Sequence, residues 1–196
     1  MQPDLTELKG AQRAACRCRR AALGEGYRLE AGSGILRRLE AMPEYRASGL
    51  ILAYASVGPE PDTRALIDRA LASGKSVALP RCDTAAHTIG FYLIASSGEL
   101  VPGCYGIPEP PDAARKADCA GGLLIVPALC CDRFCGRLGQ GGGYYDRFLA
   151  GFPGFSAALC YAALLSAEPL PRENCDLCVS AVVTENEIIY NNTDLC

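Results

Sequence analysis

Residues 136–149, GRLGQGGGYYDRFL, place a cluster of glycines directly before two tyrosines, an aspartate and an arginine. Glycine lets the backbone adopt positive φ and approach a ligand without a Cβ in the way, so successive N–H groups can converge on an anion. Arg137 adds a delocalised charge for phosphate oxygens, and Asp146 adds a carboxylate of the kind that holds Mg²⁺ beside phosphates. The glycines of the cluster are Gly139, Gly141, Gly142 and Gly143. These residue types indicate a nucleotide-binding loop.

Neither familiar phosphate signature fits this segment. A P-loop needs Gly-Lys followed by Ser or Thr, and the segment has no such lysine. The dinucleotide pattern GxGxxG can begin at Gly139 and Gly141, but Tyr144 then occupies the position of the last glycine. From the residues alone, a glycine-rich turn before a helix, with Tyr144 and Tyr145 as half-buried aromatics, stays an equal alternative.

Alternating strands and helices are expected to position this loop. Nearly continuous apolar runs, typical of strands buried on both faces, predict strands over 50–57, 76–80, 88–95, 122–129, 155–164 and 178–185, with a hairpin strand over 186–190. Helical spacing predicts helices over 5–23, 33–42 and 63–73 and a helix that starts at 144, with Ser33 and Gly74 as boundary residues. The alternation predicts one α/β domain over 1–196, a three-layer α/β/α, Rossmann-like fold with a mostly parallel central sheet. Ligands of such sheets bind at the carboxyl ends of the strands.

Composition and charge argue against several kinds of partner. The chain has 196 residues and a net charge of −3, from 19 basic and 22 acidic residues, which gives no electrostatic case for nucleic acid or an anionic membrane. No apolar run approaches the roughly 18 to 20 residues that span a bilayer, and the start, MQPDLTELKG, does not resemble a signal peptide. We expect a cytoplasmic monomer with no nucleic-acid and no membrane partner.

The twelve cysteines are expected to be mostly small, buried, reduced thiols. A zinc site is the alternative, because Cys175 and Cys178 form a CxxC pair. The other candidate ligands are Cys130, Cys131 and Cys135. These groups have dissimilar spacings, and the single histidine, His87, is distant from both in the sequence, whereas zinc sites normally show two matched ligand pairs.

The run IVPALCCDRFCGRLGQGGGYYDRFL, residues 125–149, resembles the signature of the 5-formyltetrahydrofolate cyclo-ligase family. The matching positions are Asp132, Gly136, Arg137, Leu138, Gly139, Gly141, Gly143, Tyr144, Tyr145 and Asp146. Further matches in family order are Lys9 and Arg13, Glu60 and Thr63, Pro80 and Arg81, GIPEP at 106–110, and Val183, Thr184 and Glu185. Nearly the whole chain is therefore covered.

Four positions depart from the family pattern. Cys131 replaces a phenylalanine, Gly122 replaces a frequent acid, and Gln140 stands where a basic residue sometimes occurs. Ser180 aligns with a late aspartate that some members offer to the metal, which puts a metal role for that segment in doubt.

The resemblance implies ATP-dependent cyclisation of 5-formyltetrahydrofolate to 5,10-methenyltetrahydrofolate, with ADP and phosphate released through an iminium phosphate. It implies ATP as co-substrate, Mg²⁺ at Asp146, and Tyr144, Arg137 and Lys9 as catalytic residues. The ATP-binding residues would be Lys9, Arg13, Arg137, Leu138, Gly139, Gln140, Gly141, Gly142, Gly143, Tyr144 and Tyr145. The folate-binding residues would be Ala55, Glu60, Gln140 and Tyr144.

Other interpretations of the same residues stay open. Lys9 and Arg13 lie one helical turn apart, and such pairs usually form only a solvated face. Glu60 alone would be a turn acid, and Arg81 could serve an ion pair or a phosphate. The alternative functions are an ATP-dependent ligase or phosphotransferase of another small acid, a non-catalytic nucleotide-binding module, and a zinc-bound interaction protein.

Overall fold

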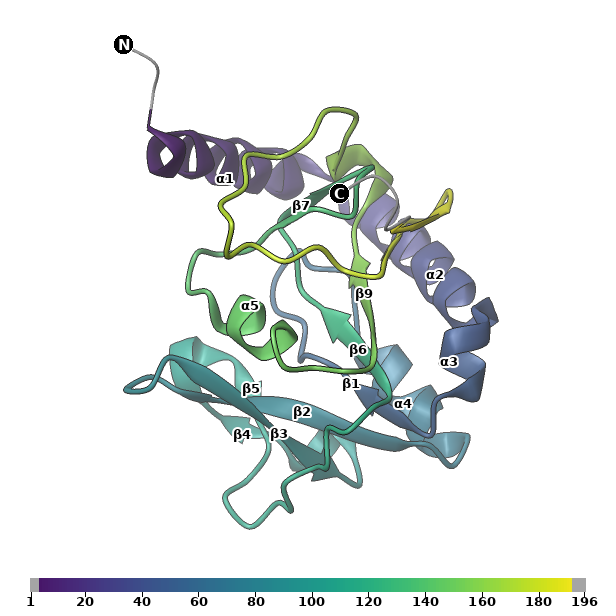
Figure 1. Ribbon diagram of the computed structural model, residues 1–196. Helices are drawn as coiled ribbons and strands as arrows, with labels where there is room; N and C mark the ends of the chain where they lie inside the picture. Colours follow the sequence, from purple (N-terminus) through teal and green to yellow (C-terminus); the bar gives the residue numbers. More distant parts are fainter. Residues whose placement is uncertain (1–3, 192–196) are drawn as a thin grey trace.

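The helices expected from the sequence are all present, and one of them starts earlier than expected. The computed structural model describes residues 4–191 (Figure 1). The α-helices are α1 (Leu5–Ala22), α2 (Glu25–Ala41), α3 (Pro43–Ala47), α4 (Arg64–Ala72) and α5 (Tyr144–Leu149); short 3-10 helices are η1 (Ser97–Glu99), η2 (Cys104–Gly106) and η3 (Ala162–Leu164). The expected helix over 33–42 is wrong at its start, because α2 begins at Glu25 and Ser33 lies inside it. Tertiary contacts hold the earlier turns: the Tyr27 ring lies 6.0 Å from that of Tyr161, and the Tyr27 hydroxyl donates to Glu185.

The main sheet has seven strands in the order β12-β11-β9-β6-β1-β2-β3. Its strands are β1 (Leu50–Leu52), β2 (Ser76–Asp83), β3 (Thr88–Ile94), β6 (Leu123–Val126), β9 (Phe155–Leu159), β11 (Ala181–Val183) and β12 (Ile188–Tyr190). The five central strands are parallel, and β3 and β12 pair antiparallel at the two edges. The predicted α/β fold with a mostly parallel sheet is confirmed.

Strand β1 is shorter than the apolar run that predicted it. The run continues to residue 57, but β1 ends at Leu52. Beyond it the buried Thr63 side chain replaces strand partners, because its hydroxyl donates to the Tyr54 carbonyl at 2.5 Å and accepts the Ser56 N–H at 3.1 Å. The apolar residues after Leu52 thus belong to a braced loop over 53–63.

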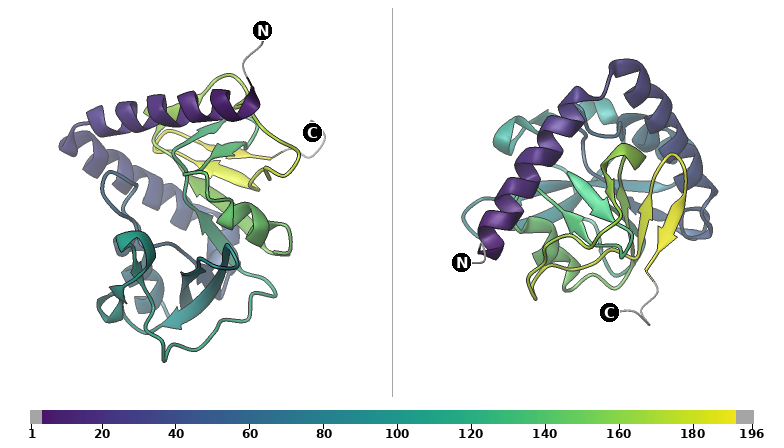
Figure 2. Two further views of the ribbon diagram at one scale, coloured as in Figure 1. Left: turned by 90° about the vertical axis from the view of Figure 1, so that its left-hand side faces the viewer. Right: turned by 90° about the horizontal axis from the view of Figure 1, so that it is seen from above.

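The direction of the chain reverses in the middle of the sheet. From β1 the chain moves to β2 on one side, and from β6 it moves to β9 on the other. Right-handed crossovers in opposite directions place their helices on opposite faces, which puts α4 and α5 on either side of the sheet (Figure 1). Such a reversal leaves a crevice at the carboxyl ends of the two central strands, where α/β folds bind ligands. Helix α1 lies across this edge (Figure 2).

The segment 130–143, expected to be a loop, contains a hairpin. Strands β7 (Cys130–Asp132) and β8 (Arg137–Leu138) pair antiparallel, and β10 (Leu165–Ser166) joins β7 in a second, small sheet. A further hairpin joins β4 (Val101–Pro102) to β5 (Pro108–Glu109). The Asp132 carboxylate is fully buried and accepts the N–H groups of Phe134, Gly136 and Leu170 at 2.7 to 2.8 Å. One side chain thereby fixes the hairpin that leads into the glycine cluster.

The expectation that most cysteines are buried is wrong for residues 4–191, where five of the eleven are buried; Cys196 lies outside the described residues. The buried ones are Cys16, Cys130, Cys131, Cys135 and Cys160. Cys18 and Cys175 are exposed, because α1 and the segment around Cys175 lie at the surface. None of the helices within 4–191 combines the length and apolar character that a bilayer crossing demands.

We predict that Asp132→Ala lowers the free energy of unfolding by about 2 kcal/mol or more, because the buried N–H groups of Gly136 and Leu170 and the partly buried N–H of Phe134 lose their acceptor. Urea unfolding followed by circular dichroism measures this loss. Asp83→Ala is the matched control, since Asp83 accepts two N–H groups in an exposed turn where water can replace it. Equal losses for both variants would contradict a special role for Asp132.

Candidate functional site

Two loops leave the sheet side by side at the carboxyl ends of β1 and β6. These strands are parallel neighbours, with Ile51 opposite Leu123 and Leu52 opposite Leu124. The loop over 53–63 follows β1 and carries Ala55 and Glu60, while the chain after β6 carries the β7–β8 hairpin and the glycine cluster. Because the two strands run parallel, both candidate ligand loops lie at the same edge of the sheet.

The glycine cluster forms an exposed turn between β8 and α5. Gly141 and Gly143 have φ values of 102° and 67°, in the left-handed region that other residues rarely adopt. Leu138 is buried in β8 and anchors the start of this turn. Helix α5 has only six residues, so the dipole at its N-terminus is weak. Most of the positive charge near the turn therefore comes from side chains.

Helix α1 supplies those cations from one face. Lys9 is only 5% exposed and forms ion pairs with Asp176 and, at 3.4 Å, with Glu173. Arg13 donates from Nε to the Gly139 carbonyl at 3.1 Å, and Arg17 donates two hydrogen bonds to Oε1 of Gln140 at 3.2 and 2.9 Å. Lys9 and Arg13 therefore both contact segments distant in the sequence and do not form only a solvated face.

Electrostatics support the Lys9–Asp176 pair. Burial raises the pKa of Asp176, but its hydrogen bond with Lys9 and the N–H of Glu173 lower that pKa overall. The pKa of Lys9 is raised: burial works against this, and the two carboxylates outweigh burial. The charged forms of both groups are thus favoured.

Arg137 and Asp146, expected to bind phosphate and metal respectively, pair with each other. Nη2 of Arg137 lies 2.8 Å from Oδ1 of Asp146, and the Leu177 N–H donates to the same oxygen at 3.3 Å. Arg137 is 8% exposed, and its buried Nε has no hydrogen-bond partner within the described chain. An orphaned guanidinium N–H of this kind is a ready donor for an anionic ligand.

Glu60 occupies a largely buried position in the loop after β1. Its side chain is 12% exposed; Oε2 accepts the Val57 N–H at 3.0 Å and Oε1 lies 3.9 Å from Nη2 of Arg20. Burial raises the pKa of Glu60, while the Val57 N–H and the Arg20 guanidinium lower it, with a raised pKa as the net result. Ala55 lies half-buried in the same loop and packs on the core.

The two tyrosines after the glycines differ in environment. The Tyr144 hydroxyl lies 3.0 Å from that of Tyr105, and this hydrogen bond, with burial, raises the pKa of Tyr144 to about 12. The Tyr145 hydroxyl is buried and has no hydrogen-bond partner among residues 4–191. Burial raises the pKa of Tyr145, Cys82 and Glu60 raise it further, and Arg137 lowers it. Tyr145 is therefore influenced by Glu60 from the loop after β1 and by Arg137 from the chain after β6.

Three other positions singled out in the sequence lie apart from this cluster. Ser180 bonds with Ser156 at 3.2 Å near the start of β9, so it does not join Asp146. Arg81 pairs with Asp112 at 2.7 Å and lies over the Tyr92 ring, which favours the ion-pair interpretation. Glu173, Cys175 and Asp176 form the one group within 4–191 whose metal-ligating atoms cluster, and Lys9 already contacts both of its carboxylates.

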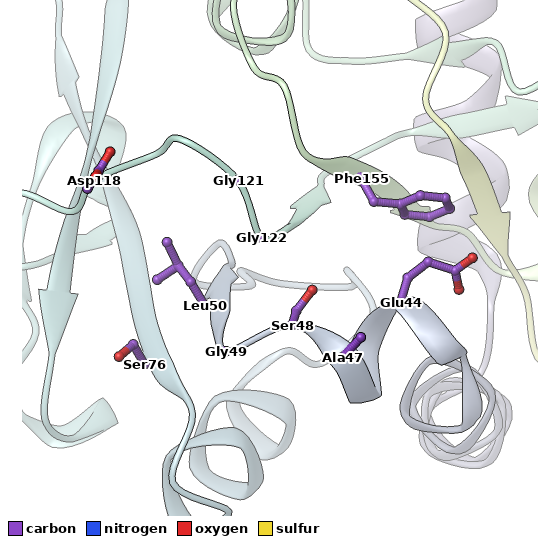
Figure 3. A pocket seen from close by; sticks show the side chains of 10 residues that line it. All are labelled: Glu44, Ala47, Ser48, Gly49, Leu50, Ser76, Asp118, Gly121, Gly122 and Phe155. Carbon is purple, nitrogen blue, oxygen red and sulfur yellow. The ribbon is translucent and has the colours of Figure 1, made fainter.

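An open hollow of about 680 Å³ lies at the opposite edge of the sheet (Figure 3). Its walls come from the amino ends of strands, including Leu50, Ser76 and Phe155, and from Glu44 and Asp118. It contains none of the residues expected to bind ligand. Ligands of parallel sheets bind at the carboxyl ends, so we assign the candidate site to the other edge.

The sequence interpretation missed three residues of this site. Arg20 lies eleven positions after Lys9, close to three helical turns, so helical spacing could have placed both on one face of α1. Tyr105 immediately precedes the GIPEP segment but has no periodic signal. Asp176 was obscured because it lies between the two cysteines of the CxxC pair.

Comparison with known proteins gives consistent matches over most of the chain. The model of the 5-formyltetrahydrofolate cyclo-ligase family matches residues 5–185. The 5-formyltetrahydrofolate cyclo-ligase of Escherichia coli K12 is 31% identical over 177 residues, and the match covers 88% of this chain and 97% of the Escherichia coli protein. A probable 5-formyltetrahydrofolate cyclo-ligase of Schizosaccharomyces pombe is 29% identical over 176 residues, covering 80% and 85%.

Solved structures agree. The NMR structure of 5,10-methenyltetrahydrofolate synthetase from Aquifex aeolicus superposes with a TM-score of 0.82 at 28% identity, covering 94% of this chain and 93% of that one. The family model spans far more than half of the chain, and the glycine cluster, the cations of α1 and Glu60 all lie inside the matched range. The chain therefore belongs to the 5-formyltetrahydrofolate cyclo-ligase family.

Proposed function

We propose that the protein cyclises 5-formyltetrahydrofolate to 5,10-methenyltetrahydrofolate and consumes ATP in doing so. One observation carries the proposal: a cation-rich glycine turn and a buried carboxylate meet at one edge of the sheet, on loops that follow neighbouring parallel strands. The first suits a triphosphate and the second suits the N–H donors of a pterin.

We assign the nucleotide to the glycine turn. Arg13 contacts the turn, Arg137 lies in the strand before it and Lys9 lies one helical turn before Arg13; these three cations would neutralise phosphate oxygens, with the unpartnered Nε of Arg137 as one donor. Ion pairs with Asp176 and Asp146 hold Lys9 and Arg137 in place without ligand. The remaining ATP contacts assigned to this turn are Leu138, Gly139, Gln140, Gly141, Gly142, Gly143, Tyr144 and Tyr145.

Asp146 is the residue we assign to Mg²⁺. Both of its observed hydrogen bonds end on Oδ1, and a carboxylate oxygen is the donor that this hard cation prefers. When bound beside the phosphates, Mg²⁺ would neutralise charge that develops during phosphoryl transfer.

We assign folate to the loop after β1 and to the adjacent tyrosine. Glu60 would accept hydrogen bonds from the pterin, and Ala55 would line the same pocket. Tyr144, fixed by Tyr105, would contact the formyl group, and the Gln140 amide, held by Arg17, would face the substrate between the two loops.

The proposed reaction has two steps. The formyl oxygen attacks the γ-phosphorus, the bond to ADP breaks, and the formamide becomes an iminium phosphate. The neighbouring folate amine then attacks the formyl carbon, loses its proton, and phosphate leaves as the ring closes. Such phosphoryl transfer depends on positioning and charge stabilisation rather than on covalent help from the protein.

The direct test is an absorbance assay, because methenyltetrahydrofolate absorbs in the near ultraviolet where the substrate does not. We expect product only when protein, ATP and Mg²⁺ are all present. Binding of ATP and folate without product would identify a non-catalytic module. ADP release only with a different small acid would identify another ATP-dependent ligase.

We predict that Glu60→Gln and Arg137→Ala act on different substrates. Glu60→Gln leaves pterin donors poorly satisfied, costing about 1 to 3 kcal/mol, or about 5- to 150-fold in apparent folate affinity, with little change for ATP. Arg137→Ala removes a charge-assisted phosphate contact and should do the reverse. Steady-state kinetics with each substrate varied in turn measures both constants. Equal impairment of both substrates by Glu60→Gln would refute the placement of the pterin.

Asp146→Asn tests the metal assignment. The amide keeps the shape of the side chain but loses the charge that Mg²⁺ needs. We expect the Mg²⁺ concentration for half-maximal activity to rise by at least roughly 10-fold. Loss of a residue that only supports a metal ligand already weakens metal binding by about that factor. Asp83→Asn, in an exposed turn, should leave the Mg²⁺ titration unchanged. An unaltered titration for Asp146→Asn would exclude it as a ligand.

A further inference from the structure

Arg20 lies in the last turn of α1, between the two ligand loops. It is 6% exposed, unlike Arg17 and Arg19, whose side chains are exposed. On the same helix Arg13 contacts the glycine turn and Lys9 pairs with Asp176, whereas Arg20 reaches the loop that carries Glu60. One helix therefore contributes charge to both halves of the site.

The contacts of Arg20 join the ends of the two central strands. Nη1 donates to the Ala128 carbonyl at 3.2 Å, just beyond β6, and Nη2 lies 3.9 Å from Oε1 of Glu60, in the loop after β1. Burying a guanidinium is costly unless it gains partners, so a buried arginine with these two contacts is not an incidental surface residue.

The groups that face Glu60 come from three elements. Arg20 approaches from α1, Tyr54 from the chain after β1, and Tyr145 from α5. Arg20 is the one cation in ion-pair distance of Glu60 within residues 4–191. Burial of Glu60 favours its neutral form and Arg20 opposes this effect, so loss of Arg20 would raise the pKa of Glu60 further.

We propose that Arg20 is a positioning residue for folate: anchored on the Ala128 carbonyl, it keeps Glu60 ionised and oriented to accept the N–H donors of the substrate. This inference rests on the proposed function, in which Glu60 binds the pterin. It assigns Arg20 no contact with either substrate; Arg20 acts through Glu60.

The test is direct binding of 5-formyltetrahydrofolate, without ATP, between about pH 6 and pH 9. Arg20→Gln keeps a donor for the Ala128 carbonyl and removes the charge, while Arg20→Lys keeps the charge. We expect Arg20→Gln to weaken folate binding on the order of 10-fold at neutral pH, because the N–H donors of the substrate lose part of a charge-assisted hydrogen bond to Glu60. Binding should recover as the pH rises and Glu60 ionises again. ATP affinity should change little, and Arg20→Lys should restore most of the folate affinity.

Arg19→Met is the matched control, because Arg19 is exposed on the same helix and its side-chain hydrogen bond goes to the Cys16 thiol, away from Glu60. It should leave the pH profile of folate binding unchanged. The double variant Arg20→Gln/Glu60→Gln should bind folate no more weakly than Glu60→Gln alone, because residues that act as a unit are not additive.

The outcomes separate this inference from the proposed function. If the unaltered protein does not bind folate, the proposed function fails. If Glu60→Gln binds folate normally, the placement of the pterin is refuted and the role of Arg20 with it. If Glu60→Gln weakens binding but Arg20→Gln does not, or weakens it equally at every pH, the role of Arg20 is refuted. Folding of each variant is checked by thermal melting. Should Arg20→Gln not fold, Arg20→Lys decides. If Arg20→Lys loses folate binding on acidification at the same midpoint pH as the unaltered protein, the charge-based role is supported. If that midpoint pH differs, the role is overturned.

Discussion

The parallel pairing of β1 with β6 is the constraint on which the candidate site depends. These strands lie at the point where the chain direction reverses, so each sends its loop to the same side and into the same crevice. With the pairing in place, Glu60 and the hairpin before the glycine turn are neighbours although about 70 residues separate them along the chain. A different strand order would leave the same residues on separate surfaces.

Helix α1 completes the candidate site because it crosses that edge with two of its basic residues, Lys9 and Arg20, buried against it. Each cation that becomes buried there has an acidic or carbonyl partner: Lys9 has Asp176, Arg137 has Asp146, and Arg20 has Glu60 and Ala128. Partners of this kind are needed because an unpaired buried charge is strongly unfavourable. They also hold long, flexible side chains near their final positions, which reduces the ordering that ligand binding would require.

Local patterns predicted much of the architecture. Apolar runs located all seven strands of the main sheet, and helical spacing located α1, α4 and the start of α5. The errors have physical causes. Strand β1 ends early because Thr63 bonds to the backbone after it, and α2 starts early because Tyr27, ahead of the predicted start, contacts Tyr161 and Glu185. The hairpin over 130–138 was missed because the buried Asp132 carboxylate, rather than a hydrophobic alternation, closes its turn.

The sequence by itself determined the chemical types present: glycines able to adopt positive φ at 141 and 143, the parallel α/β pattern, and the motif that resembles the cyclo-ligase family. It could not determine which charged groups pair. Arg137 contacts Asp146, Arg20 contacts Glu60 and Tyr105 contacts Tyr144 only because the sheet register and the docking of α1 bring separate segments together. Ion pairs and hydrogen bonds act over a few ångströms, whereas sequence patterns report only on neighbours along a helix or strand. The residue types of the candidate site can therefore be read from the sequence, whereas their ion pairs and hydrogen bonds depend on the folded structure.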